Sequence, residues 1–309
     1  MGRALTRRCL GLGHTVCVFS RSESRQAEFA AELGVQPNVR FFIGDVRDKD
    51  RLLDAMWHCD AVAHLAALKR VDSVSSNPME TRLTNVQGSA NVTAAALTAG
   101  VPKVLMVSSD KAVMPTNAYG ATKSAMEHEA IAVNAISWPR GTSVACTRWG
   151  NVIASTGSVI GIWAAAMQRS EPLPITDPDC TRFWLTVETA CDIFLEALEL
   201  MQGGEVFLPV LPAMRLGDLA EAVAPGYPTV TVGMRAGGEK AHEQLLNDEE
   251  VRRTVAVNDR LYVVKPSLHP WRGDEWLDGE PLPPEFCYRS DLVGWKLSVP
   301  EMRKLLEAL

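Results

Sequence analysis

The chain has 309 residues, a formal net charge of −6 and 47% hydrophobic residues, the composition of a globular protein of one or two domains. The acidic balance argues against a nucleic-acid binder, whose surface would carry an excess of lysine and arginine. The seven cysteines are widely spaced without a CxxC pair, so neither a disulfide framework nor a metal site is expected. No apolar run is long enough to span a bilayer, so we expect a cytoplasmic protein that binds no membrane.

The first predicted element is a helix over residues 2–10, after which short apolar runs alternate with longer helical patterns. Buried strands are predicted at 14–20, 39–45, 61–67, 103–109 and 142–149, and helices at 22–34, 48–57, 78–99 and 118–135. This alternation predicts an α/β fold with a doubly wound parallel sheet of the Rossmann, NAD(P)-binding type. Such sheets bind their ligands at the carboxyl ends of the strands.

The start of the chain differs from a doubly wound dinucleotide fold, which begins with a strand and a G-x-x-G-x-x-G turn. Gly2 stands where the last glycine of that turn would be. We therefore expect the first strand and most of the glycine loop to be missing from this sequence. The alternative is a fold that begins with a helix.

The sequence after residue 150 is richer in proline and glycine, and its predicted elements are shorter. A helix is still predicted at 187–202 and a strand at 205–210. We expect a dinucleotide-binding domain made of residues 1–150 together with 187–210. Residues 151–186 and 211–309 would form a smaller α+β lobe that binds the substrate.

Tyr119 and Lys123 form a Y-x-x-x-K pair within the predicted helix 118–135. Residues four apart share one face of a helix, and an ammonium group beside a phenol lowers the phenol pKa. Such a tyrosine can act as a base near neutral pH. The preceding strand ends in Ser108-Ser109, where a further hydroxyl partner would sit; an ordinary surface pair is the alternative reading.

Several longer motifs accompany this pair. Residues 108–123 read SSDKAVMPTNAYGATK, and RWGNV, PITD, TRFW and GMRAGGEKAHE occupy 148–152, 174–177, 181–184 and 233–243. Together these motifs resemble those of the extended short-chain dehydrogenase/reductases, and within them the UDP-N-acetylglucosamine 4,6-dehydratases of the polysaccharide-biosynthesis group. The last motif carries one extra residue, and Met114 replaces a common asparagine.

The resemblance implies a lyase that oxidises the sugar at C4 with NADP⁺, removes water across C5–C6 and returns the hydride to C6. Tyr119 would be the base at the 4-hydroxyl, with Lys123 tuning it and holding the cofactor ribose, and Ser109 would bind the developing carbonyl. Lys111 would be the base at C5 and Asp110 the acid at the departing 6-hydroxyl; an exposed ion pair is the alternative. With a tyrosine at position 119, the sequence resembles the inverting enzymes of this group, which also epimerise C5.

A cofactor site at the strand ends follows from the resemblance and the strand positions. Arg21, after Ser20, would pair with a 2′-phosphate, which favours NADP over NAD; a solvated loop arginine is the alternative. The other implied cofactor contacts are Gly2, Ser20, Asp45, Val46, Ala66, Ala67, Lys69, Tyr119 and Lys123.

The implied substrate contacts are Lys69, Asn151, Arg182, Arg235 and Glu239. Asn151 and the two arginines would bind the diphosphate, and Glu239 the uridine ribose. A homo-oligomer is also expected, because members of this family assemble through their helices.

Two other functions stay open at this point. One is a related nucleotide-sugar enzyme, either a 4-epimerase or a 5,6-dehydratase; Asp110 and Lys111 argue against an epimerase, which needs no elimination acid. The other is a truncated, non-catalytic protein that binds a nucleotide sugar, which only the incomplete start of the chain supports.

Overall fold

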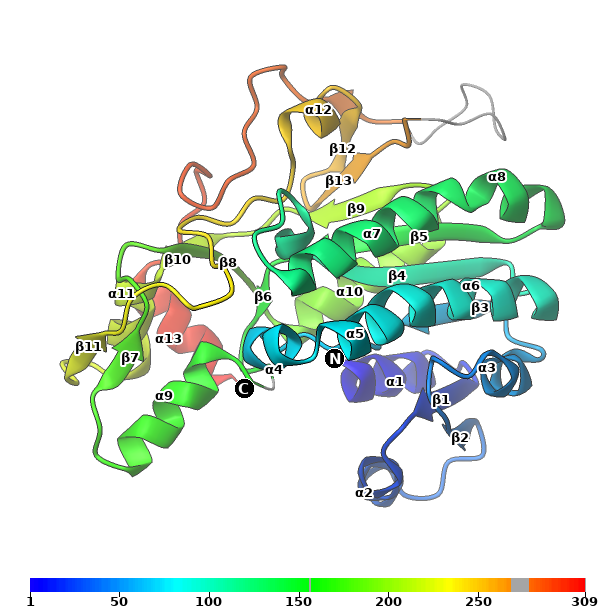
Figure 1. The fold of residues 1–309 in the computed structure, drawn as a ribbon, viewed down its shortest axis with the longest axis horizontal. Coiled ribbons are helices and arrows are strands. Elements are labelled where there is room, and N and C mark those ends of the chain that lie inside the picture. Colours follow the sequence, from blue (N-terminus) through cyan, green and yellow to red (C-terminus); the bar gives the residue numbers. More distant parts are fainter. Residues whose placement is uncertain (156, 268–277, 309) are drawn as a thin grey trace.

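A computed structural model describes residues 1–155, 157–267 and 278–308, so residues 268–277 of the predicted substrate lobe lie outside the described part. The main sheet runs across the middle of the molecule in the order β14-β12-β13-β9-β5-β4-β3 (Figure 1). Its parallel strands are β3 (Ala61–His64), β4 (Lys103–Ser109), β5 (Ser143–Trp149) and β9 (Val206–Pro209). The predicted parallel α/β sheet is thus confirmed.

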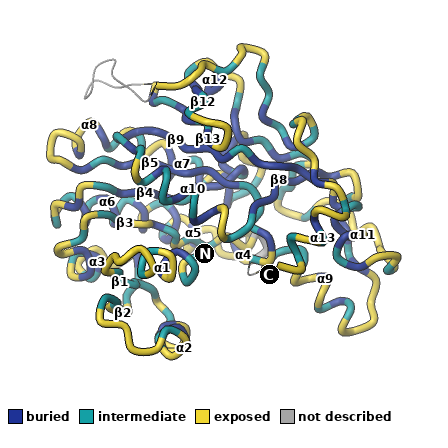
Figure 2. Tube along the Cα trace, turned by 180° about the vertical axis from the view of Figure 1, so that it is seen from behind, coloured by how far each residue is buried: buried dark blue, intermediate teal, exposed yellow. Residues whose placement is uncertain are grey.

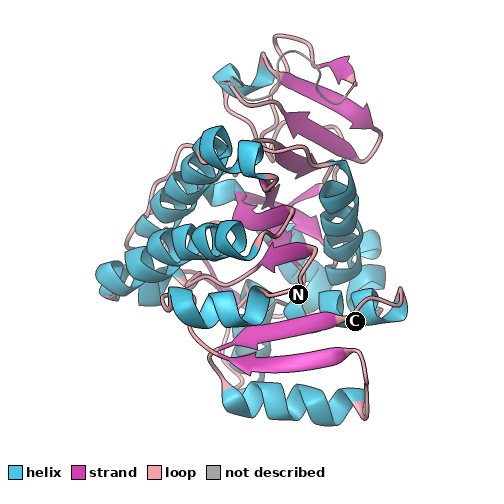
Figure 3. Cartoon of the chain, turned by 90° about the vertical axis from the view of Figure 1, so that its right-hand side faces the viewer, coloured by secondary structure: helices cyan, strands magenta, loops and turns pink. Residues whose placement is uncertain are grey.

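Helices cover both faces of this sheet (Figure 3). On one side lie α5 (Pro78–Arg82), α6 (Gly88–Ala99) and α7 (Ala118–Ala132), and on the other α1 (Gly2–Gly11) and α10 (Val187–Leu200). The central strands are buried between them: Val104, Leu105 and Val144 are fully inaccessible to solvent. The helix predicted over 78–99 is one continuous helical run, with a wider turn at Leu83–Gln87.

The strands β1 (Val16–Ser20) and β2 (Val39–Ile43) form a separate parallel pair. No ladder joins β1 to β3 in the described residues, and every residue of β1 is only half-buried, unlike the buried central strands (Figure 2). The helices α2 (Glu23–Leu33) and α3 (Lys49–Met56) complete this region. An additional strand between β1 and β3 would join the two sheets. That such a strand is missing from this sequence remains a prediction.

A second hydrophobic cluster, which includes Trp163, Trp184 and Met302, forms the core of a smaller lobe. Its elements are β6 (Asn151–Val152), α9 (Val159–Gln168), β7 (Leu173–Ile175), β8 (Thr181–Leu185), β10 (Ala213–Arg215), α11 (Leu216–Val223), β11 (Thr229–Thr231) and α13 (Val299–Glu307). The region 151–186 therefore holds a full helix where the sequence predicted mostly loop. Between the lobe and the sheet lies the loop that carries residues 232–247.

Three strands that the sequence assigned to the substrate lobe instead extend the main sheet. They are β12 (Thr254–Asn258), β13 (Leu261–Val264) and β14 (Glu280–Pro281), and β13 pairs antiparallel with β9. The remaining short helices are α4 (Val71–Ser76), α8 (Asn134–Ser137) and α12 (Asp248–Val251). Within the described residues, every helix is too short or too polar to cross a bilayer.

Candidate active site

The central feature of the site is the turn that joins β4 to α7. Ser109 ends β4, and a 3-10 turn at Asp110–Ala112 follows it. The Asn117 side chain accepts a hydrogen bond from the Gly120 N–H at 2.9 Å and so caps the start of α7. A Cβ at Gly120 would lie 2.2 Å from the Lys111 carbonyl oxygen, so only glycine allows this close approach. The turn therefore holds Asp110 and Lys111 beside the first turns of α7.

Tyr119 and Lys123 are both buried on α7, but they do not interact as the sequence predicts. The Lys123 Nζ donates to the Val107 carbonyl oxygen at 2.7 Å, and burial lowers the Lys123 pKa to about 8. Burial raises the pKa of Tyr119 to about 12, opposed by the charge of Lys111 and a hydrogen bond with Ser109. The expected lowering of the Tyr119 pKa by Lys123 is therefore absent from this structure, since the lysine points toward β4.

Asp110 is completely buried, which excludes the exposed ion pair considered above. Its Oδ1 accepts hydrogen bonds from Ser109 Oγ at 2.7 Å and Lys111 Nζ at 3.0 Å. Its Oδ2 has no hydrogen-bond partner among the described residues. Burial raises the pKa of Asp110, and the neighbouring Glu243 adds to this effect against the charge of Lys111. A buried carboxyl with one free oxygen and a raised pKa suits a general acid.

The Lys111 ammonium group has acceptors on three sides. Its Nζ lies 3.0 Å from Asp110 Oδ1, 3.2 Å from Glu243 Oε1 and 3.4 Å from Asn151 Oδ1. Burial works to lower the pKa of Lys111, but Asp110 and Glu243 outweigh it and the net shift is upward. The resting lysine is therefore charged, so it must give up a proton before it can act as a base.

Lys240 connects the loop 232–247 to the turn at Asp110–Ala112. Its Nζ donates to the carbonyl oxygens of Asp110 and Val113, at 3.2 and 2.6 Å. Gly238 has a φ of +100°, and a Cβ there would lie 2.0 Å from the Thr116 carbonyl oxygen. Both the positive φ and the close approach require glycine at this position. The loop is thus packed directly against the turn.

The implied substrate residues gather around this loop. Arg182 donates to Glu239 at 2.7 Å and to the carbonyl oxygens of Thr181 and Ala241, so its guanidinium is occupied by protein acceptors. Arg235 is freer, with its Nε 3.9 Å from Glu239 and its side chain 37% exposed. A small cavity of about 40 Å³ is lined by Lys111, Thr116, Asn117, Arg235, Gly238, Glu239, Lys240 and Glu243. Arg235 is the better placed of the two arginines to meet an incoming phosphate.

The predicted cofactor residues lie on the strand ends and loops to one side of this cavity. Arg21 follows β1, and its exposed guanidinium is 3.7 Å from Asp45, which Arg47 binds more closely at 2.7 Å. The Arg47 hydrogen bond lowers the Asp45 pKa and keeps this carboxylate charged. The Lys69 Nζ lies 3.4 Å from Ser155 Oγ. Ser20, Val46, Ala66 and Ala67 lie on the same strand ends, and Gly2 opens α1.

These residues fit a nicotinamide dinucleotide. Gly2 lies in the first turn of α1, and the N-termini of helices favour phosphate groups. Arg21 is exposed and basic, which suits a 2′-phosphate. Tyr119 and Lys123 lie on α7 next to β4, where the nicotinamide half would reach.

A second buried network lies beside the site on α7, β5 and α12. Arg148 donates through two nitrogens to Glu127, at 3.0 and 2.6 Å, and to both oxygens of Glu250, at 3.0 and 2.9 Å. It also donates to the Leu245 carbonyl oxygen at 2.7 Å. This network ties α7 to the chain segment that follows Glu243.

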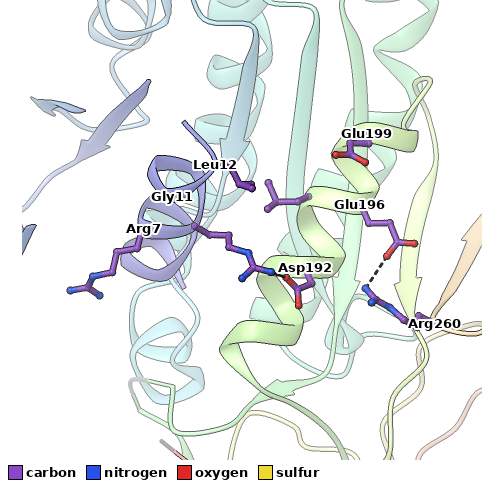
Figure 4. Close-up of a pocket in the computed structure, with 9 residues that line it drawn as sticks. Arg7, Gly11, Leu12, Asp192, Glu196, Glu199 and Arg260 are labelled. Carbon is purple, nitrogen blue, oxygen red and sulfur yellow. Dashed lines mark hydrogen bonds and ion pairs between the residues drawn. The ribbon is translucent and has the colours of Figure 1, made fainter. Parts of the chain in front are cut away.

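A larger open pocket of about 630 Å³ lies elsewhere, between α1, α10 and the β12–β13 turn (Figure 4). Arg8 pairs with Asp192 there, and Arg260 with Glu196 at 3.0 Å. Two of its arginines are thus paired with acidic residues of the same pocket, and none of the predicted site residues described above lines it. We therefore place the active site at the Asp110–Lys111 turn.

Sequence reasoning missed two members of the site, Lys240 and Glu243. Both belong to the motif at 233–243, which carried the resemblance, but only Arg235 and Glu239 received a role there. Glu243 is 2% exposed and contacts Lys111 and Lys240. No spacing rule connects it to the 108–123 motif, because the fold alone brings the two segments together.

The family model for polysaccharide biosynthesis proteins matches residues 1–266. The chain belongs to this family. It is 41% identical, over 82% of its length and 75% of the relative's, to a UDP-N-acetylglucosamine 4,6-dehydratase (inverting) of Campylobacter jejuni. It is also 38% identical, over 78% of its length and 72% of the relative's, to a UDP-glucose 4-epimerase of Rickettsia conorii. The resemblance drawn from the sequence motifs is confirmed.

Solved structures show the same fold. The structure of Pen from Bacillus thuringiensis superimposes with a TM-score of 0.90 and 31% identity, covering 100% of this chain and 95% of that one. DesIV, a dTDP-glucose 4,6-dehydratase of Streptomyces venezuelae solved with NAD and TYD, gives a TM-score of 0.69 at 22% identity, covering 77% and 83%. The family's extended short-chain dehydrogenase/reductase architecture therefore holds across this chain.

Proposed function

We propose that this protein is a UDP-N-acetylglucosamine 4,6-dehydratase that inverts C5. The observation that carries the proposal is the ion pair of the fully buried Asp110 with Lys111, next to Tyr119, since this pair would supply an acid and a base for elimination beside a base for oxidation. The 41% identity to an inverting enzyme of this activity supports the same substrate.

The chain's own residues divide the work into two parts. A nicotinamide dinucleotide, when bound, supplies the hydride acceptor at C4 and the hydride donor at C6. Tyr119 takes the proton of the 4-hydroxyl, and Ser109, its hydrogen-bond partner, steadies the oxygen that becomes the carbonyl. Lys123, whose Nζ donates to the Val107 carbonyl oxygen on β4, would hold the cofactor ribose.

Elimination then uses the adjacent pair. The 4-ketone makes the C5 proton acidic, and the Lys111 amine removes it once its own extra proton has left. Asp110 donates a proton to the 6-hydroxyl, which leaves as water. The proton gained from C5 replaces the proton lost with water, so the pair returns to its starting state. C5 then takes a proton from the opposite face, which gives inversion. The proton that Tyr119 took from the 4-hydroxyl balances this one, so the protein ends with the protons with which it began.

The decisive experiment is turnover of UDP-N-acetylglucosamine with NADP⁺ in deuterium oxide, followed by mass spectrometry and NMR. We expect a product that has lost one water, carries deuterium at C5 and has the inverted configuration there. A product of unchanged mass formula with an inverted C4 would instead identify a 4-epimerase. That second candidate has one observation in its favour, the 38% identity to a protein named as such.

We propose NADP rather than NAD as the cofactor, on the exposure of Arg21 at the end of β1. Thermal-shift titrations with NADP⁺ and NAD⁺ test this, because a ligand that binds the folded state raises the melting temperature with its concentration. Arg21→Ala should weaken the response to NADP⁺ alone, whereas Arg25→Ala, on the exposed side of α2, should not. An equal response to both cofactors would contradict the choice.

The expectation of a homo-oligomer stays a prediction. Light scattering on the purified chain, coupled to size-exclusion chromatography, measures its molar mass directly.

A further inference from the structure

Glu243 is a buried carboxylate for which the sequence assigned no role. Its Oε1 lies 3.2 Å from Lys111 Nζ, and its Oε2 lies 3.3 Å from Lys240 Nζ, an ion-pair contact outside hydrogen-bond geometry. Its side chain is 2% exposed, so water cannot screen these charges. A glutamate in this position acts directly on the charge of Lys111.

The backbone fixes Glu243 in place. Its N–H donates to Ser290 Oγ at 2.9 Å, and its carbonyl oxygen accepts from the Ser290 N–H at 2.8 Å. Ser290 Oγ is in turn 2.6 Å from Thr181 Oγ1 on β8. The backbone of Glu243 is therefore anchored to β8 through Ser290.

We propose that Glu243 is a positioning residue for elimination: its carboxylate holds the Lys111 amine beside Asp110 and sets the charge that this pair carries. The inference rests on the proposed function, because it assigns Glu243 to the elimination step of that reaction. Glu243, on the loop 232–247, would thus act together with Asp110 and Lys111, which both belong to the 108–123 motif.

The charges around the pair give the direction of the effect. Several charged and polar groups face Lys111 from different elements. They are Asp110 on the Asp110–Ala112 turn, Tyr119 on α7, Asn151 on β6, Arg182 on β8, Lys69 after β3, and Glu243. Glu243 raises the pKa of both Asp110 and Lys111. Its own pKa falls to about 2, because Lys111, Lys240 and Arg182 outweigh the effect of burial. Glu243 thus stays charged wherever the enzyme works.

The test is the pH profile of C5 deuterium incorporation in Glu243→Gln. Removing the carboxylate lowers the pKa of the acid and of the base together. Both limbs of the profile should therefore move to lower pH, by about one unit or more. The C4 oxidation step, followed by the absorbance of the reduced nicotinamide, should keep its own pH profile. Glu249→Gln, the same change at an exposed position of α12, is the matched control and should leave both profiles in place.

Glu243→Asp separates charge from shape, because it keeps the carboxylate but moves it away from Lys111. Its profile should move in the same direction by less than that of Glu243→Gln, and it decides the matter alone if the glutamine variant does not fold. A lowered rate with an unmoved profile in either variant overturns the inference and leaves the proposed function standing. If the wild-type protein removes no water from the sugar, the proposed function and this inference fall together.

Discussion

The proposed active site has an elimination half, with Asp110 and Lys111, and an oxidation half, with Tyr119 and Lys123. The surroundings of the two pairs differ, although all four residues lie within 109–123. In the elimination half, Lys111 lies within 3.2 Å of two carboxylates, and one of these is shared with Lys240. In the oxidation half, Tyr119 and Lys123 are buried without a charged group at hydrogen-bonding distance in the described structure, and burial dominates both pKa shifts. The ionisable groups of the first half are thus paired with charged groups of the protein, whereas those of the second half are not.

The difference shows how a single turn can support two kinds of proton transfer. Paired charges keep a proton within the Asp110–Lys111–Glu243 cluster, so elimination can return its proton to where it began. The Tyr119 phenol is not paired in this way: burial raises its pKa, and the charge of Lys111 and the hydrogen bond with Ser109 only partly oppose that rise. The following predictions test this division, from the largest expected effect to the smallest.

Lys111→Ala should stop elimination while leaving oxidation at C4 in place. Loss of the base should lower the rate of water loss by about 10³-fold or more, and reduced cofactor should accumulate. Stopped-flow absorbance measures the second quantity, and mass spectrometry the first. Lys304→Ala, at an exposed position of α13, serves as the control. Full dehydration by Lys111→Ala would place the second base elsewhere.

Tyr119→Phe should slow oxidation itself, by about 10²- to 10³-fold, because the 4-hydroxyl loses its base. In the wild-type protein the Tyr119 pKa of about 12 means that the ionised form is scarce at neutral pH. The rate of oxidation should therefore rise with pH below that value, and Tyr119→Phe should lose this rise. A pH dependence that survives in the variant would show that another group takes the proton.

Arg148→Met should reduce stability without moving any pH profile of catalysis. It leaves the buried Glu127 and Glu250 without their shared partner, which costs about 3 kcal/mol or more. Urea unfolding followed by circular dichroism measures the change. A shift in the elimination profile would show that this network also tunes the active site.

His64→Gln should make the protein less sensitive to acid. His64 on β3 is 4% exposed, and burial together with the charge of Lys123 lowers its pKa to about 3. The ordinary pKa of histidine is about 6.5. Between about pH 3 and 6.5 the unfolded state therefore binds a proton at His64 that the folded state does not bind. Stability should therefore fall by about 2 kcal/mol as the pH drops from 6.5 to 5. Unfolding midpoints at the two pH values should show a smaller loss in the variant; an equal loss would assign it to other groups.

Sequence patterns predicted the regions of the fold that local rules govern. The run 103–109 forms β4 over those residues, because its apolar stretch from Val104 to Val107 is typical of a strand buried on both faces. The helix α9 was missed because its sequence, VIGIWAAAMQ, is apolar nearly all round and is followed by prolines. The residues of β12 to β14 were assigned to the substrate lobe, since the pairing of β13 with β9 depends on the folded sheet and leaves no local signal.

The same distinction applies to the candidate active site: residues within one motif could be predicted, whereas contacts between distant segments could not. The motif 108–123 contains Ser109, Asp110, Lys111, Tyr119 and Lys123; the first three lie at the β4–α7 turn, and the last two lie on α7. Which group Lys123 binds could not be predicted, because the Val107 carbonyl oxygen lies on a different element. Glu243 could not be predicted either, because its role follows from a contact between a lobe loop and the end of a central strand.

The clamp that Lys240 makes on the carbonyl oxygens of Asp110 and Val113 has a consequence for how the enzyme fails. If the loop 232–247 detaches on heating, the turn that carries the acid and the base loses its anchor at the same moment. Dehydration should then be lost at a lower temperature than oxidation, because Tyr119 and Lys123 are held by α7. A protein heated to that point would stop at the C4 oxidation step.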